Sequence, residues 1–342
     1  MDSNGGPVER GPLTIAQIAE RAGVSVATVS KVVNGRQVSN ETRDLVEHVI
    51  RQWGYRRQRK VAAPAPLVEL VFHVLGGDYA MEIIVGAERA ARHHHLAVMV
   101  SGLDGRQAPS RGWIDELVSR RPTGVVWVFC SPTDAQVEQL RSRDIPFVMI
   151  DPITDPGTRF PSVSVNNWSA GLAATRHLLE LGHRRIGVIA GPAYALASRA
   201  RLDGYRAALD AAHVPVDPDL IVQGDFQITR GAENARHLLR LPDPPTAIFA
   251  ASDRDAIGVY QVAYELGLRI PRDLSVVGFD DIPPVSWLTP PLTTVRQPLA
   301  DMAATAVNMV SDLARDEQPS HPEVIFSAGL VVRGSTGPPG SG

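Results

Sequence analysis

Apolar residues follow two alternating spacings along most of this chain. From residue 67 onward, short apolar runs such as LVELVFHV at 67–74 precede stretches whose apolar positions recur every three or four residues. Short continuous apolar runs are typical of buried strands, and apolar positions that recur every three or four residues are typical of amphipathic helices. Repeated strand-then-helix units predict parallel α/β sheets, and a second series restarts at Trp168. The predicted strands are 67–74, 96–102, 123–129, 145–150, 162–165, 185–191, 220–222, 246–252, 274–280 and 291–295, with a strand pair in 324–332; the predicted helices are 79–93, 110–120, 168–181, 198–213, 229–241, 255–266 and 299–314.

The segment Thr14–Val33 has a different pattern, that of two short helices joined by a tight turn. Thr14 and Gln17 form a capping box that starts the first helix, and Gly23 is suited to end it. Ser25 caps the second helix, whose Val29 and Val32 face the first. A helix-turn-helix of this kind presents the start of its second helix to DNA. The alternative is a helical hairpin inside an unrelated core.

Two features next to this segment favour the DNA-binding interpretation. Ser39 begins a third helix, which closes a small core and ends before Gly54. A basic run then follows, and such runs neutralise phosphates. Residues 1–65 contain ten Lys and Arg against six Asp and Glu, whereas the remainder contains 24 against 31. A basic headpiece on an acidic body indicates nucleic-acid binding by the headpiece alone.

The sequences AERAGVSVATVSKVVNG (19–35) and VSNETRDLVEHVIRQWGYR (38–56) resemble the headpiece of the lac repressor (LacI/GalR) family. The resemblance implies that Val26 and Ala27 choose the operator, with Lys31 one turn further on. Val26 and Ala27 offer only apolar contact, whereas Lys31 can donate to guanine or phosphate. The DNA-binding residues expected on this basis are Thr14, Ser25, Val26, Ala27, Thr28, Ser30, Lys31, Arg56, Arg57 and Arg59. The family's minor-groove leucine has no counterpart in 57–66, where Pro64 interrupts the hinge helix.

The resemblance also implies a two-lobed core like that of periplasmic binding proteins. The expected domains are a disordered N-terminus at 1–12, an all-α headpiece at 13–60, a linker at 61–66, a core at 67–335 and a flexible tail at 336–342. Lobe 1 is expected at about 67–160 and 290–318, and lobe 2 at about 161–284 and 322–335. The crossings between lobes would lie near 158–162, 283–289 and 319.

Ligands of such folds bind where strands end, in the cleft between the lobes. Asp151, Ser252 and Asp280 each stand at a strand end, and Arg201 lies in the family motif ARLDGY. These four side chains would hydrogen-bond a polyhydroxylated ligand, and Phe226 would stack on its flat face. The full expected effector set is Tyr79, Asp151, Arg201, Phe226, Ser252, Asp280 and Gln297. For Asp253 a helix-capping role is favoured, and Trp168 could face the cleft or pack at the hinge.

Composition and motifs narrow the class of protein further. The 342 residues are 44% hydrophobic and 21% charged, as in ordinary globular chains. The single cysteine, Cys130, lies in an apolar run and is interpreted as a reduced core residue, and neither a signal peptide nor a membrane span is expected. No catalytic or phosphate-binding motif is recognised, so an enzyme is not expected. No cofactor is expected. A metal site is not expected either, because the three rings of His93–His95 point in different directions.

The prediction is therefore a cytoplasmic transcriptional repressor that binds pseudo-palindromic double-stranded operator DNA and is released by a mono- or oligosaccharide. It would act as a homodimer, with a tetramer as the alternative. The residues leave open whether the effector induces or corepresses. The competing class is a sugar-binding solute receptor without a regulatory DNA role, which would leave residues 14–60 unexplained.

Overall fold

The computed structural model describes residues 13–33, 38–53, 64–157, 160–319 and 321–340. The chain divides into two units, Met1–Ala63 and Pro64–Gly342, which are considered separately. Three helices form the first unit: α1 (Ile15–Arg21), α2 (Val26–Val33) and α3 (Asn40–Trp53). Their shared core contains Leu13, Ile18, Ala19, Ala22, Val29, Val32, Val46 and Val49. The predicted three-helix headpiece is thereby confirmed, and Gly23 has the expected positive φ of 62° after α1.

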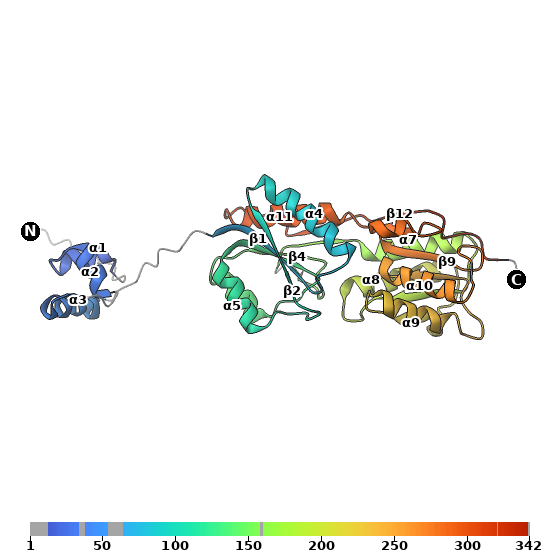
Figure 1. The fold of residues 1–342 in the computed structure, drawn as a ribbon, viewed down its shortest axis with the longest axis horizontal. Helices are drawn as coiled ribbons and strands as arrows, with labels where there is room; N and C mark the ends of the chain where they lie inside the picture. Colours follow the sequence, from blue (N-terminus) through green and yellow to red (C-terminus); the bar gives the residue numbers. More distant parts are fainter. Residues whose placement is uncertain (1–12, 34–37, 54–63, 158–159, 320, 341–342) are drawn as a thin grey trace, which may run out of the picture. The chain divides into compact units, whose positions relative to one another are not determined.

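Lobe 1 of the second unit contains a six-stranded sheet in the order β11-β5-β4-β3-β1-β2, parallel throughout. Helices α4 and α11 cover one face of it, and α5 and α6 cover the other (Figure 1). The strands are β1 (Ala65–Phe72), β2 (Ala97–Gly102), β3 (Pro122–Val128), β4 (Phe147–Ile150), β5 (Ser162–Val165) and β11 (Glu323–Phe326). The helices are α4 (Asp78–His93), α5 (Arg111–Arg120), α6 (Asp134–Arg141) and α11 (Leu299–Leu313).

Lobe 2 repeats this design with the strand order β12-β10-β9-β8-β6-β7, in which only β12 runs antiparallel to its neighbour. Its strands are β6 (Ile186–Ala190), β7 (Ile221–Gln223), β8 (Ala247–Ala250), β9 (Ser275–Asp280), β10 (Thr293–Arg296) and β12 (Gly329–Val331). Helices α7 (Asn167–Glu180) and α8 (Leu196–Ala211) cover one face, and α9 (Ile228–Leu238) and α10 (Asp253–Glu265) the other. Short 3-10 turns occupy Pro218–Leu220 and Pro283–Ser286.

The strand pairing corrects the predicted positions of the lobe crossings. β5 pairs with β4 in lobe 1, so the first crossing follows Val165 instead of lying near 158–162. β10 pairs with β9 in lobe 2, which moves the second crossing from 283–289 to residues 297–298. β11 belongs to lobe 1 and β12 to lobe 2, so the third lies at 327–328, not near 319. A strand of only three or four residues is compatible in sequence with either sheet, and its pairing partner decides which sheet it joins.

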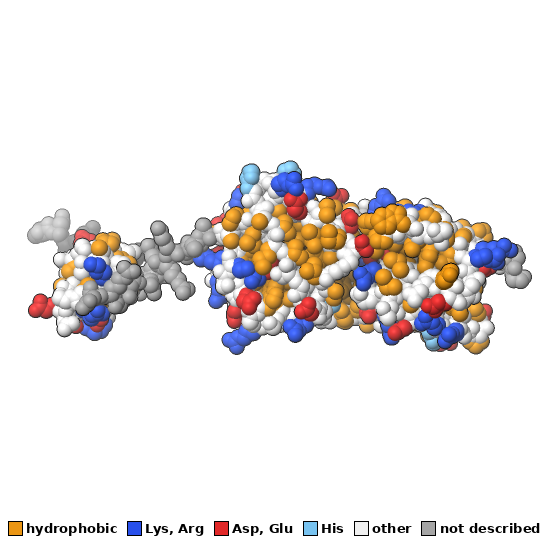
Figure 2. All heavy atoms as spheres, in the orientation of Figure 1, with side chains coloured by type: hydrophobic (Ala, Val, Ile, Leu, Met, Phe, Trp, Pro, Cys, Tyr) orange, Lys and Arg blue, Asp and Glu red, His pale blue; other side chains and the backbone are white. Residues whose placement is uncertain are grey.

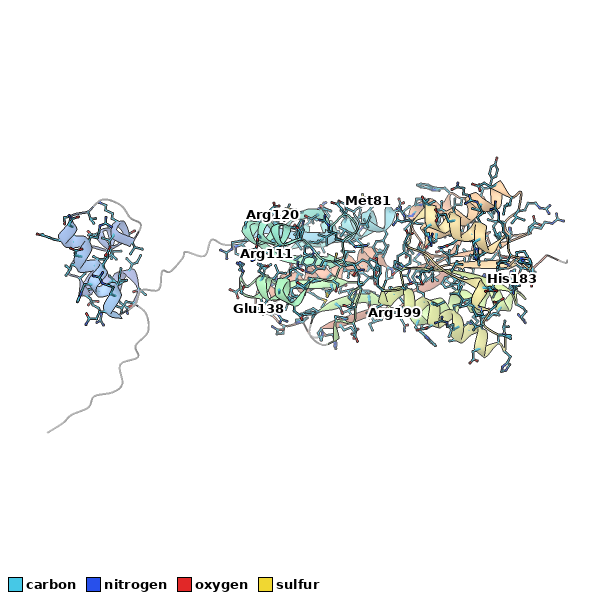
Figure 3. The ribbon with its side chains drawn as sticks, turned by 90° about the horizontal axis from the view of Figure 1, so that it is seen from below. Met81, Arg111, Arg120, Glu138, His183 and Arg199 are labelled. Atoms are coloured by element: carbon cyan, nitrogen blue, oxygen red, sulfur yellow. The ribbon has the colours of Figure 1, made fainter. Side chains whose placement is uncertain are left out.

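The segment after β12 is bound to lobe 2. Ser335 is fully buried and its Oγ donates to the carbonyl of Val276 at 2.6 Å. Gly337 accepts a hydrogen bond from the buried ring of His183 at 2.9 Å, and Thr336 pairs with His177. The expected flexible tail at 336–342 is thus tied to the sheet by its first two residues. Arg120 of lobe 1 and His183 of lobe 2 lie toward opposite ends of this unit (Figure 3).

Candidate functional site

In the headpiece, each helix start is fixed by its own side chains. Thr14 and Gln17 form the predicted capping box, with the Gln17 amide N–H donating to Thr14 Oγ1 at 3.4 Å. Ser25 Oγ accepts from the amide of Thr28 at 3.1 Å and so starts α2. The hydroxyl groups of Thr14 and Ser25 therefore act as helix caps.

The outward side of α2 matches the expected recognition surface. Val26, Ala27 and Lys31 are exposed, while Val29 and Val32 are buried against the other helices. Val26 does not belong to the headpiece core and is 54% exposed, which leaves its methyl groups available for contact. Thr28 and Ser30 are partly buried at the edge of this surface. The predicted contacts Arg56, Arg57 and Arg59, and the hinge as far as residue 63, lie outside the described residues. The predicted linker at 61–66 is too long, because β1 already begins at Ala65.

In the core, a cavity of about 860 Å³, counted with the solvent in its mouth, lies between the two lobes. Lobe 1 has the strand order 2-1-3-4-5, and lobe 2 repeats it with β7-β6-β8-β9-β10. Each order contains a switch point where successive connections leave in opposite directions and open a crevice. The cavity is lined from the loops at both switch points, after β1 and β3 in lobe 1 and after β6 and β8 in lobe 2.

Six of the seven predicted effector residues line this cavity: Tyr79, Asp151, Arg201, Phe226, Ser252 and Asp280. Gln297 is not among the lining residues. It is buried behind Asp280, to whose Oδ1 its side-chain Nε2 donates at 2.6 Å. Trp168 does not line the cavity either and is 45% exposed at the start of α7.

The cavity floor combines polar groups from both lobes. In lobe 1, the Tyr79 hydroxyl donates to Asp151 Oδ2 at 2.7 Å, and Asp151 Oδ1 has no hydrogen-bond partner among the residues the structure describes. In lobe 2, Arg201 lies with its Nη1 3.9 Å from Asp280 Oδ1. Asp151, Arg201 and Asp280 are all at least nine-tenths buried. Burial of this kind is costly unless the groups find partners, which a ligand can supply.

Burial also sets the titration of these groups. It raises the pKa of Asp280 to about 6, although Arg201 and Gln297 act in the opposite direction. Burial likewise raises the pKa of Asp151, against the hydrogen bond from Tyr79 and the charge of Arg201. The pKa of Arg201 is lowered by burial, which the nearby carboxylates partly offset. Perturbed groups gathered in one cleft are typical of functional sites.

Aromatic rings form the walls of the cavity. Phe226 of lobe 2 meets Phe129 of lobe 1 edge to face, with ring centroids 6.0 Å apart. The ring centroids of Phe129 and His73 are 5.8 Å apart. Phe226 lies so close to Gly191 that a Cβ there would be 2.0 Å from the ring, so any larger residue at 191 would displace the ring. Rings from both lobes can cover the apolar faces of a bound molecule.

Four non-glycine residues that line the cavity have positive φ: Phe129 (53°), Asp151 (46°), Phe226 (62°) and Asp280 (120°). Such conformations are strained for residues with a Cβ and concentrate at ligand sites. Three of the four, Phe129, Asp151 and Asp280, follow or end a strand of their own lobe's sheet, where the chain must turn sharply into the cleft.

Ser252 and Asp253 have structural roles. Ser252 caps α10 by accepting from the amide of Asp255 at 3.1 Å and donating to its carboxyl at 2.7 Å, although it also borders the cavity. Asp253 is fully buried and accepts from Thr294 and from the amide of Ile282. The cap that was expected at Asp253 is therefore supplied by the residue before it.

Several residues of the cavity wall are not among those predicted from the sequence. His73 and Phe129 directly follow β1 and β3, and Arg254 lies in the first turn of α10. The strand-end rule that selected Asp151 applies equally to His73 and Phe129 and could have found both. In the described part of the chain, no three His, Cys, Asp or Glu side chains come together as metal ligands, and no helix is long and apolar enough to span a membrane.

A three-helix DNA-binding headpiece followed by a two-lobed core with a ligand cleft defines a transcriptional regulator controlled by a small molecule. Residues 14–58 match the family described as bacterial regulatory proteins, lacI family, and residues 175–336 match the periplasmic binding protein-like domain. The chain is 33% identical to the HTH-type transcriptional repressor CytR of Escherichia coli (strain K12), over 94% of this chain and 96% of the relative. The chain therefore belongs to the lacI family of DNA-binding transcriptional regulators.

Two solved structures support this assignment over nearly the whole chain. The CelR–cellobiose complex of a transcriptional regulator superposes with a TM-score of 0.72 at 31% identity, covering 94% of this chain and 99% of the other. The lac repressor dimer bound to operator and the anti-inducer ONPF gives 0.68 at 27% identity, covering 96% and 100%.

Proposed function

We propose that this regulator is a repressor of carbohydrate-utilisation genes that leaves its operator when a sugar occupies the cleft. The observation that carries the proposal is the cavity floor, where Asp151 of lobe 1 faces Arg201 and Asp280 of lobe 2. Carboxyl and guanidinium groups complement sugar hydroxyls, which both donate and accept hydrogen bonds. A ligand held by groups of both lobes favours one arrangement of the lobes over another.

On the DNA side, the exposed start of α2 would enter the major groove. Val26 and Ala27 would contact thymine methyl groups, and Lys31 would donate to guanine or to phosphate. Thr14, Ser25, Thr28 and Ser30 would contact phosphates at the groove edge, where hydroxyls and helix N-termini set the register. Arg56, Arg57 and Arg59 would add salt-dependent affinity.

The regulator would act as a homodimer on a pseudo-palindromic operator. In support of this, α4 exposes Met81 and Val85, 55% and 45% accessible, and Figure 2 shows apolar side chains gathered over this part of lobe 1. Figure 3 shows Met81 on the outer side of α4. Apolar groups exposed in this way are typical of subunit interfaces. The protein would act in the cytoplasm, where its DNA is, and without catalytic activity.

The effector couples to DNA only if it binds the two lobe arrangements with different affinity. The testing experiment measures binding of the full-length protein to a duplex that it selects from a randomised pseudo-palindromic library, with and without a panel of sugars. We expect at least one sugar to weaken operator binding. Sugar binding without any effect on DNA affinity would instead favour a solute receptor, and tighter DNA binding would indicate corepression.

A further inference from the structure

Helix α8, which carries Arg201, is capped at its start by the other lobe. The first N–H groups of a helix have no partner within the helix and need another acceptor. The N-cap residue of α8 is Ala195, whose side chain cannot accept a hydrogen bond. The acceptor for the next amide comes from lobe 1, because the N–H of Leu196 donates to the carbonyl oxygen of Ile153 at 3.1 Å. Ile153 lies between β4 and β5, so a carbonyl of lobe 1 caps a helix of lobe 2.

The loop that supplies this carbonyl is fixed within lobe 1. The amide of Asp151 donates to the carbonyl of Val163 on β5 at 3.0 Å. Further along the loop, Thr154 Oγ1 lies 3.4 Å from Ser131 Oγ of the loop after β3. Ile153 itself is 1% exposed. The carbonyl of Ile153 and the carboxyl of Asp151 therefore move together with lobe 1.

The start of α8 is fixed in the same way within lobe 2. Gly171 of α7 approaches α8 so closely that a Cβ there would be 2.3 Å from the carbonyl oxygen of Arg201. The guanidinium of Arg201 donates to Asn167 Oδ1 at 2.8 Å and to the carbonyl of Ala251 at 2.6 Å. The amide of Leu196 and the guanidinium of Arg201 therefore move together with lobe 2.

The hydrogen bond between Leu196 and Ile153 thus joins the two elements that carry effector residues. Asp151 lies two residues before Ile153, and Arg201 lies five residues after Leu196, just over one turn along α8. The bond can form only when the loop after β4 lies against the start of α8. A ligand that bridges Asp151 and Arg201 holds the same two elements together. Bond and ligand therefore favour the same arrangement of the lobes.

Other contacts across the cleft are made by side chains. The Tyr194 hydroxyl lies 3.5 Å from Nε2 of His73, and the ring of Phe226 meets that of Phe129 edge to face. Such side chains can change rotamer when the lobes move. A bond between two backbone atoms has no such freedom, so it defines the position of α8 more closely.

We propose that the hydrogen bond from Leu196 to Ile153 positions Arg201 of lobe 2 opposite Asp151 of lobe 1 and so prepares the cleft for its effector. The inference rests on the proposed function, in which the effector binds between these two side chains. The amide of Leu196 is a positioning group and does not itself have to touch the ligand. Without it, effector binding must also bring the two lobes into place, which weakens binding.

A proline at the start of α8 removes this one donor. Leu196→Pro has no N–H at residue 196, and proline is favoured at the first position of a helix. Ala195 already has the extended backbone, with ψ 130°, that the residue before a proline requires. Leu196→Ala is the matched control, because it loses the same side chain and keeps the N–H. Arg111→Pro places a proline at the same position of α5, where the residue does not line the cavity.

Titration calorimetry of the full-length variants with the tightest-binding sugar of the panel tests the role of the bond. We expect Leu196→Pro to bind this sugar about 3- to 10-fold more weakly than Leu196→Ala, the loss that one hydrogen bond produces. Release from the selected duplex should require correspondingly more sugar, and Arg111→Pro should match wild type. Equal affinities of Leu196→Pro and Leu196→Ala, or an equal loss in Arg111→Pro, overturn the inference. No sugar binding by wild type overturns the proposed function and this inference with it.

Hydrogen–deuterium exchange of the wild type tests the bond without any substitution, and it decides if Leu196→Pro does not fold. The first amide of a helix exchanges rapidly when it has no partner. Mass spectrometry with fragmentation to single residues compares Leu196 with Arg111, which hold the same position in α8 and α5. We expect slower exchange at Leu196, slowed further when the sugar is bound. Exchange at Leu196 as fast as at Arg111 overturns the inference.

Discussion

Tyr79 donates its phenolic hydrogen to Oδ2 of Asp151 at 2.7 Å and thereby joins the first turn of α4 to the end of β4. The bond uses Oδ2 of the carboxyl, and Oδ1 is buried without a hydrogen-bond partner among the described residues. Tyr79 also packs against the cores of both lobes. Because Tyr79 has contacts on both sides of the cleft, its packing depends on how the lobes are arranged.

Tyr79→Phe should weaken sugar binding about 3- to 10-fold, because it removes the hydrogen bond that orients the carboxyl group of Asp151. The ring and its packing remain, so the midpoint of thermal unfolding should change little. Titration calorimetry with the tightest-binding sugar of the panel measures the affinity. Equal affinities of wild type and variant would show that the Tyr79–Asp151 bond does not organise the site.

Sugar affinity should rise as the pH increases from 5 to 7 and then level off. Burial raises the pKa of Asp280 from 3.8 to about 6, and only the ionised carboxylate accepts hydrogen bonds at both oxygens. The burial-raised pKa of Asp151 acts in the same direction. Asp280→Asn should flatten this profile. A wild-type profile that is already flat would contradict the assignment of Asp280.

The same shift has the opposite effect on the stability of the ligand-free protein. The folded form of Asp280 holds its proton more tightly than the unfolded chain, so this group stabilises the fold below pH 4. Its contribution is lost as the pH rises from about 4 to 6. Denaturant titrations at several pH values should show a smaller decline for Asp280→Asn than for wild type.

Lys31→Ala should weaken operator binding and reduce discrimination at one base position by about 1–3 kcal/mol if Lys31 donates to guanine. Lys31 is exposed on the outer side of α2, whereas Val26 and Ala27 carry no hydrogen-bonding side chain. Anisotropy titrations on the selected duplex and a scrambled duplex distinguish the two contacts. Equal losses on both duplexes would assign Lys31 to a phosphate.

Arg120→Ala should destabilise lobe 1 by about 3 kcal/mol, because it leaves a buried carboxylate without its ionic partner. Glu69 is fully buried and receives hydrogen bonds from Arg120 at 2.7 and 3.2 Å and from Ser101 at 2.8 Å. Arg111→Ala is the control on the same helix, α5, where Figure 3 shows both arginines. Similar urea unfolding curves for the two variants would mean that the Glu69 pair contributes little.

Local signals in the sequence predicted most of the elements and most of the cleft. Asp151 and Asp280 were found because parallel strands deliver their last residues to one edge. Helix α6 was missed, although Thr133 and Gln136 form a capping box at its start, because its eight residues carry few apolar positions. Gln297 was placed in the cleft because sequence position does not distinguish a residue that touches a ligand from one that holds Asp280.

Local sequence signals could not predict which lobe each short strand belongs to. β5, β10 and β11 are four residues long, and their apolar patterns are compatible with either sheet. Only long-range pairing, such as that of Val163 with Val324, assigns them. The position of Arg201 likewise depends on a contact with Asn167, 34 residues away in the sequence.

The most direct test follows operator release and sugar binding in the same protein. Anisotropy of the selected duplex is measured with wild type and with Asp151→Asn while the tightest-binding sugar of the panel is titrated. We predict release of the wild type at sugar concentrations that match its calorimetric affinity, and retention of Asp151→Asn on the duplex at those concentrations. A wild type that binds the sugar but holds its operator unchanged would contradict the account.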